Sequence, residues 1–130
     1  MAAAGERRVR EPFEYAVIRL VPRVERGERI NVGVILYCQG RDFLAARTHL
    51  DADRVRALAP DVDLAEVAAA LGSWDRTCVG EGPSGRMRRG ERFRWLAAPR
   101  STMIQTGPVH TGLTVDPAAE LDRLLEALVR

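Results

Sequence analysis

The chain has 130 residues, and its hydrophobic share of 46% is enough for one core without a disulfide or a structural metal. A net charge of +2 and an aromatic share of 5% give poor support to a base-stacking surface for nucleic acid. No apolar run is long enough to span a membrane, and the first eight residues lack the apolar region of a signal peptide. We therefore expect a cytoplasmic protein with reduced cysteines.

Residues 1–12 are small or charged and have no periodicity, which predicts a flexible N-terminal arm. The remainder, 13–130, is predicted to form a single α+β domain. Three strands open it, each rich in apolar or β-branched residues: 14–21, 30–38 and 43–48. Tight connections predict that they pair as an antiparallel meander. Gly33, in the middle of the second strand, indicates a bulge or a close approach of another backbone.

Helix signals dominate the second half of the chain. Asp51 and Asp63 each precede an apolar pattern of helical spacing, and Asp116 is followed by a proline, so all three are predicted helix N-caps. Residues 92–96 are predicted to form a fourth strand, with a short one at 103–105. The expected architecture is an antiparallel sheet of four to five strands with three helices packed mainly on one face.

All 20 basic residues are arginine, and they are unevenly distributed. Residues 86–100 hold six arginines and a single acid, whereas residues 51–82 are rich in acids. One interpretation is an anion-binding surface, which includes nucleic-acid binding. The other is a solvated hairpin whose arginines pair with the acidic helices of the same domain.

The most patterned polar segment is 92–113, which combines prolines, glycines, hydroxyls, a histidine and arginines. A guanidinium beside two hydroxyls can hold a phosphate or a carboxylate, and the histidine can act as an acid or a base. In the structural alternative, the hydroxyls bond their own turns, the arginine pairs with an acid and the histidine is half-buried. The predicted ligand-binding residues are Arg29, Asn31, Arg100, Ser101, Thr102, Thr106, His110 and Thr111.

Arg29 and Asn31 belong to this set only if their strand faces the Arg100 loop. Asn31 is a polar amide among apolar neighbours on a central strand, so it needs a hydrogen-bond partner. The sequence contains no glycine-rich phosphate loop, no nucleophile elbow and no spacing typical of metal ligands. We expect no cofactor and no metal.

Several long strings resemble a bacterial family called domain of unknown function 3037. They are residues 15–22, 26–36, 92–102, 106–113 and 116–122. The resemblance covers roughly residues 13–128. It implies a domain boundary and brings no established activity, cofactor or catalytic residue. Members of this family are often encoded beside proteins that resemble HipA-type kinases, so the resemblance implies a partner or a shared pathway.

Three functions follow from these observations. The first is an uncharacterised bacterial accessory module without catalytic activity, which binds an anionic ligand or a protein partner, such as a HipA-like kinase. The second is an enzyme for a phosphorylated or nucleotide substrate, with Arg100 on the anion and His110 as acid–base group. This hypothesis requires both side chains on one face of the sheet. The third is nucleic-acid binding through residues 86–100.

Overall fold

The computed structural model describes residues 9–100 and 102–130, and within them it has five strands and four α-helices. The strands are β1 Glu11–Leu20, β2 Ile30–Cys38, β3 Phe43–Thr48, β4 Ile104–Thr106 and β5 His110–Thr114. The α-helices are α2 Ala52–Leu58, α3 Leu64–Cys78, α4 Arg89–Ala97 and α5 Pro117–Leu128. Two short 3-10 helices, η1 Gln39–Arg41 and η2 Gly82–Arg86, complete the chain.

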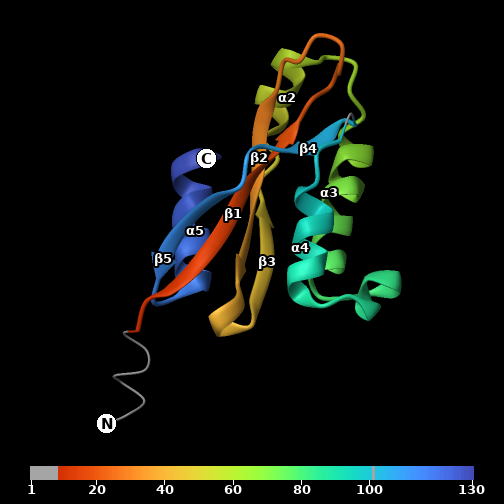
Figure 1. The fold of residues 1–130 in the computed structure, drawn as a ribbon. Coiled ribbons are helices and arrows are strands. Elements are labelled where there is room, and N and C mark those ends of the chain that lie inside the picture. Colours follow the sequence, from red (N-terminus) through yellow and green to blue (C-terminus); the bar gives the residue numbers. More distant parts are fainter. Residues whose placement is uncertain (1–8, 101) are drawn as a thin grey trace.

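All strands join one antiparallel sheet, whose order begins β3-β2-β1. The predicted meander is therefore confirmed. On the other side of β1, two strands share the long strand between them. β5 pairs with its first half, from Glu11 to Tyr15, and β4 pairs with Ile18–Leu20 near its end. The two strands lie end to end along β1 (Figure 1).

Helices cover both faces of the sheet, with α3 and α4 on one side and α5 on the other (Figure 1). We call these the α3 face and the α5 face. Each has its own cluster of buried side chains. The α3 face includes Ile18, Ile35, Val55, Leu71, Trp74 and Phe93. The α5 face includes Phe13, Val34, Leu36, Leu121 and Leu124.

A β-bulge interrupts β2 where the sequence has Gly33. Ile18 pairs with Gly33, whereas the next residue, Arg19, pairs with Asn31, so Val32 is an extra residue. A Cβ on Gly33 would lie 2.7 Å from the carbonyl oxygen of Arg47 on β3. The bulge and the close backbone approach predicted for this glycine are both confirmed.

The three predicted N-caps are also present. The Asp51 side chain accepts from the backbone N–H groups of Asp53 and Arg54, and Asp63 accepts from Glu66 at 3.1 Å. Asp116 accepts from Ala119 at 3.2 Å, with Pro117 in the first turn. Each carboxylate satisfies a donor that the helix itself leaves free.

The strand predicted at 92–96 and the predicted number and placement of the helices need correction. Residues 92–96 lie in the helix α4 rather than in a strand, because Phe93 and Leu96, three positions apart, are both buried while Trp95 is 53% exposed. There are accordingly four α-helices instead of three, and α5 packs alone on the second face. β1 begins at Glu11, inside the segment predicted as an arm, and residues 1–8 lie outside the described residues.

Candidate functional site

The two central residues of the predicted site lie on opposite faces of the sheet. Arg100 is on the α3 face, where it lines a cavity of about 290 Å³ between α3 and the chain that enters β4. Its guanidinium carbon lies 4.5 Å from the centre of the Trp95 ring, and its Nη2 donates to the Trp95 carbonyl. His110 pairs with Tyr15, which packs against the α5 core. One pocket therefore does not contain both side chains.

The hydroxyl groups near Arg100 bind their own backbone. Thr102 Oγ1 donates to the carbonyl of Ile104 at 2.8 Å, and Thr106 Oγ1 donates to that of Ala97 at 3.1 Å. Each hydroxyl has one proton to donate, so neither offers a donor to an anion in this arrangement. These bonds fix the connection between α4 and β4. Ser101 lies outside the described residues.

His110 and Thr111 are neighbours on β5 and point to opposite faces. The His110 ring is exposed, and its centre lies 5.2 Å from that of Tyr15. Thr111 is exposed on the α3 face, opposite Glu14. On β1, Tyr15 and Arg19 are four residues apart on the same face, a distance of about 13 Å along a strand. His110 therefore shares a face with Arg19 without touching it.

Asn31 holds the end of α5. Its Nδ2 donates to the carbonyl of Leu128 at 3.0 Å, which is the partner that a polar side chain on a central strand needs. Arg54, from α2, donates to the carbonyl of the next residue, Val129, at 3.1 Å. Both bonds satisfy carbonyl groups that a helix C-terminus leaves free.

Arg29 is exposed at the start of β2, and its charge acts on Arg19 of β1. Burial, and secondly the positive charge of Arg29, lower the pKa of the Arg19 guanidinium. The Nε of Arg19 is buried and has no hydrogen-bond partner. Within the part of the chain that the structure describes, neither guanidinium forms an ion pair. We call these two residues the arginine pair.

Gly107 leaves space for the guanidinium of Arg19. A Cβ at this position would lie 2.7 Å from the guanidinium carbon of Arg19, so the guanidinium lies directly against the glycine. Gly107 itself donates to the carbonyl of Val17 at 2.9 Å. The polar segment 92–113 thus meets an arginine of β1 here, on the α5 face, and not at Arg100. Arg19 is absent from the predicted set, although strand alternation from Tyr15 and its pairing with Asn31 could have identified it.

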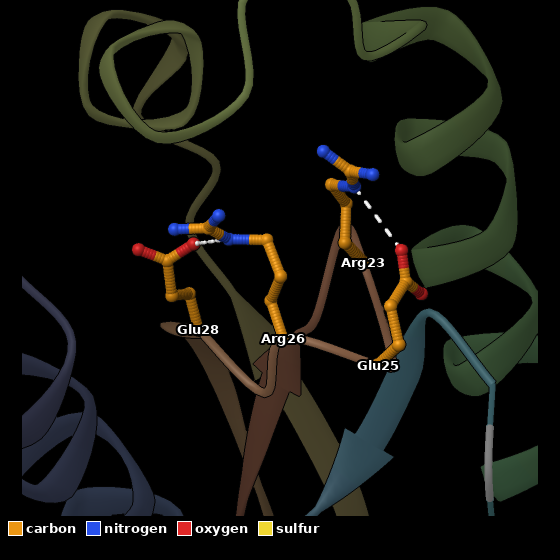
Figure 2. A network of polar contacts seen from close by, with 4 residues as sticks. All are labelled: Arg23, Glu25, Arg26 and Glu28. Atoms are coloured by element: carbon orange, nitrogen blue, oxygen red, sulfur yellow. Dashed lines mark hydrogen bonds and ion pairs between the residues drawn. The ribbon is translucent and has the colours of Figure 1, made fainter.

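The other arginines of the β1–β2 connection are neutralised. Figure 2 shows Arg23 paired with Glu25 and Arg26 paired with Glu28, at Nε–Oε1 distances of 3.2 and 2.5 Å. Each arginine thus has a carboxylate two residues away. Arg29 directly follows Glu28, which Arg26 already engages. The arginine pair is therefore distinct from the alternating charges of residues 23–28, which already pair with one another.

The arginine-rich residues 86–100 also have internal partners. Arg94 forms a bidentate pair with Glu14 at 2.6 Å, which raises the pKa of its guanidinium. Arg92 donates to the carbonyls of Ser84 and Cys78. Arg88 and Arg89 lie within 4.0 Å of carboxylates, those of Glu91 and Asp42. These acids come from α4, β1 and the β2–β3 turn, so the predicted pairing with the acidic helices is not what this segment uses.

The cysteines offer no reactive thiol. Cys38 and Cys78 are both buried, and burial raises the pKa of the Cys78 thiol to about 12. A thiol of that pKa is protonated at neutral pH and is a poor nucleophile. Residues 9–100 and 102–130 contain no group of three metal-ligating side chains. In the same residues, no helix is both long enough and apolar enough to cross a membrane.

Comparisons with known proteins give one family. No curated protein and no protein of solved structure matches the sequence. One family model, "Protein of unknown function (DUF3037)", matches residues 15–129. The match runs from β1 to the end of α5 and so includes the arginine pair and both faces of the sheet. The chain therefore belongs to the family DUF3037.

Proposed function

We propose that this chain is a non-catalytic module that binds an anionic group of a ligand or protein partner through Arg19 and Arg29. The observation that carries the proposal is the unpartnered arginine pair. Burial, and secondly the positive charge of Arg29, lower the pKa of the Arg19 guanidinium, and no described carboxylate forms an ion pair with either residue. This contrasts with the surrounding arginines, which are paired.

A bound anion would offset both the missing hydrogen-bond acceptors and the charge repulsion of the arginine pair. It would supply acceptors for guanidinium N–H groups and would replace repulsion between two positive charges by attraction to a shared negative one. Phosphate and carboxylate both match the fork geometry of arginine. Gly107 leaves open the surface on which the Arg19 guanidinium lies, and a side chain there would displace it.

The test is ligand-dependent thermal stability with inorganic phosphate, pyrophosphate and a Glu-rich peptide as probes. A ligand present at a hundred times its Kd stabilises the native state by about 2.7 kcal/mol, which is a clear rise in Tm. We expect at least one probe to give this rise with the unmodified chain. Arg29→Gln should abolish this rise, because it removes one of the two guanidinium groups. The variant should still fold, since Arg29 is exposed and its removal leaves the core intact.

The matched control is Arg26→Gln, which removes an arginine of the same exposed connection that is already paired with Glu28. It should leave the probe response unchanged. The proposal fails if no probe stabilises the unmodified chain, or if both variants lose the response equally. Equal loss would mean that only the overall positive charge matters.

A HipA-like kinase is the protein partner to test first, because the family resemblance implies such an association. The enzyme hypothesis required Arg100 and His110 on one face of the sheet, and it loses this support because they occupy opposite faces. Nucleic-acid binding through residues 86–100 also loses support, because carboxylates and carbonyl groups already engage most of these arginines.

A further inference from the structure

β3 is one edge of the sheet, and among the described residues no strand pairs with its outer side. The backbone N–H of His49 donates to the carbonyl of Val32 on β2 at 2.8 Å, which fixes the direction of the ladder. Because this direction alternates along an antiparallel strand, the backbone groups of Leu44, Ala46 and Thr48 point away from β2. Unpaired backbone groups at a sheet edge can hydrogen-bond to another extended chain.

A groove of about 380 Å³ follows this outer edge. β3 contributes residues 44–48 to its lining, and the end of α3 contributes Asp75, Cys78 and Val79. Cys78 is buried, whereas Val79 is 70% exposed although it is apolar. A chain that paired with β3 would lie in this groove beside α3, with every second side chain directed to the side of the helix.

Asp75 is a carboxylate without an ion pair in this groove. Burial raises the pKa of its carboxyl group, and the positive charges of Arg47 and Arg76 only partly oppose this effect. Arg47 instead engages Asp122 of α5 at 3.5 Å, and within the part of the chain that the structure describes Asp75 forms no ion pair. A basic group from outside would supply the missing partner and would offset the cost of desolvation.

Asp75 and Val79 match the side-chain spacing of an extended chain. They are four residues apart at the end of α3, which corresponds to a rise of about 6 Å along the helix. Two residues of a strand span about 7 Å, and side chains at this separation point to the same face. One extended chain can therefore place a basic side chain at Asp75 and an apolar side chain at Val79.

We propose that the β3 edge binds an extended segment of a partner protein as an added strand, with a basic residue at Asp75 and an apolar residue two positions away at Val79. The backbone groups of β3 select an extended chain, and Asp75 selects its charge. Arg47 does not oppose this pairing, because it points to the α5 face, where Asp122 engages it. The site is separate from the arginine pair and selects the opposite charge.

Selection from a phage-displayed heptapeptide library on the immobilised full chain tests which occupant the edge takes. We expect the enriched peptides to place Lys or Arg two positions from Val, Ile or Leu more often than the unselected library does. Selection that enriches no such pattern overturns the proposal. This is also the outcome if residues 1–8 or a second copy of the chain fill the edge.

A synthetic copy of the most enriched peptide tests the contact with Asp75, with affinity measured by fluorescence anisotropy. Asp75→Asn should raise the Kd by about tenfold, and so should Gln in place of the basic residue of the peptide. The two changes together should cost no more than either alone, because both remove the same ion pair. Asp53→Asn, at an exposed carboxylate of α2 outside the groove, is the matched control and should leave the Kd unchanged. An equal effect of Asp53→Asn, or additive effects of the first two changes, would contradict the assigned contact.

N-methylated versions of the peptide test the strand pairing itself. Methyl groups on the alternate amides that face β3 should abolish binding, whereas methyl groups on the intervening amides should leave most of it. Equal loss from both sets overturns strand addition, since only one set of amides meets β3 in a ladder.

Discussion

The arginines of α4 and the arginine pair carry the same charge but lie in different surroundings. In α4, Arg94 meets a carboxylate with both terminal nitrogens, and Arg92 meets two backbone carbonyls. Arg19 has no carboxylate partner and experiences the positive charge of Arg29, and its Nε is buried without an acceptor. The segment with the most arginines is therefore the one whose guanidinium groups are already engaged by internal acceptors and are least available to an external anion.

The difference comes from what the neighbouring elements supply. α4 lies against η2 and the start of β1, which offer carbonyl groups and Glu14. The Arg19 guanidinium lies against Gly107, which offers it no carboxylate. Whether an arginine can bind an external anion therefore depends on its competing acceptors, and these are set by tertiary structure.

The largest expected effect is on the paired side of this comparison. Arg92→Ala removes the partner of the Ser84 and Cys78 carbonyl groups, both in a part-buried setting. We expect the free energy of unfolding to fall by about 2–3 kcal/mol, measured by urea denaturation. Arg88→Ala, at a side chain that is 93% exposed, is the control and should change it by less than about 0.5 kcal/mol. Equal effects of the two variants would contradict the assigned role of Arg92.

Removal of an arginine from the arginine pair should raise the free energy of unfolding instead of lowering it. Arg19→Met keeps an apolar stem in place and removes the buried Nε and the repulsion by Arg29. We expect the free energy of unfolding to rise by about 1 kcal/mol in the absence of anions, together with loss of the phosphate response. Urea denaturation with and without phosphate measures both. A loss of stability without phosphate would show that Arg19 has a structural role.

The smallest effect concerns the exposed contact between Arg94 and Glu14. A double-mutant cycle with Arg94→Ala and Glu14→Gln should give a coupling energy of about 0.5 kcal/mol, because both charges keep access to water. Added salt should reduce it. Coupling that salt does not change would mean that the bidentate geometry, rather than charge, dominates this contact.

The sequence predicts the first three strands and three helix starts well, since their patterns are local. The meander, the bulge at Gly33 and the three aspartate caps each depend on a few adjacent residues. The assignment of 92–96 is wrong because a short mixture of polar and apolar residues fits a strand, and the same five residues fit a helix that buries only Phe93 and Leu96. The short polar β5 carries little strand signal, since its pairing with β1 comes from tertiary contacts.

The candidate site is less predictable because it depends on which face each side chain occupies. Arg100 and His110 are ten residues apart in the sequence, and β4 and a turn between them take the chain to the other side of the sheet. The contact of the Arg29–Asn31 region with the Gly107 turn passes through Arg19, which precedes both in the chain. No pattern within one segment contains this information.

The bulge in β2 gives the strand two opposite alternation patterns. From Gly33 to Tyr37, odd-numbered residues point to the α3 face, whereas Asn31, also odd, lies opposite Arg19 on the α5 face. A regular strand would turn the Asn31 amide toward the apolar core around Trp74 and away from Leu128. The additional residue Val32 therefore reverses which face of the sheet the odd-numbered side chains occupy. We therefore expect odd-numbered positions of β2 to tolerate polar side chains before Val32, as at Asn31, but not after it.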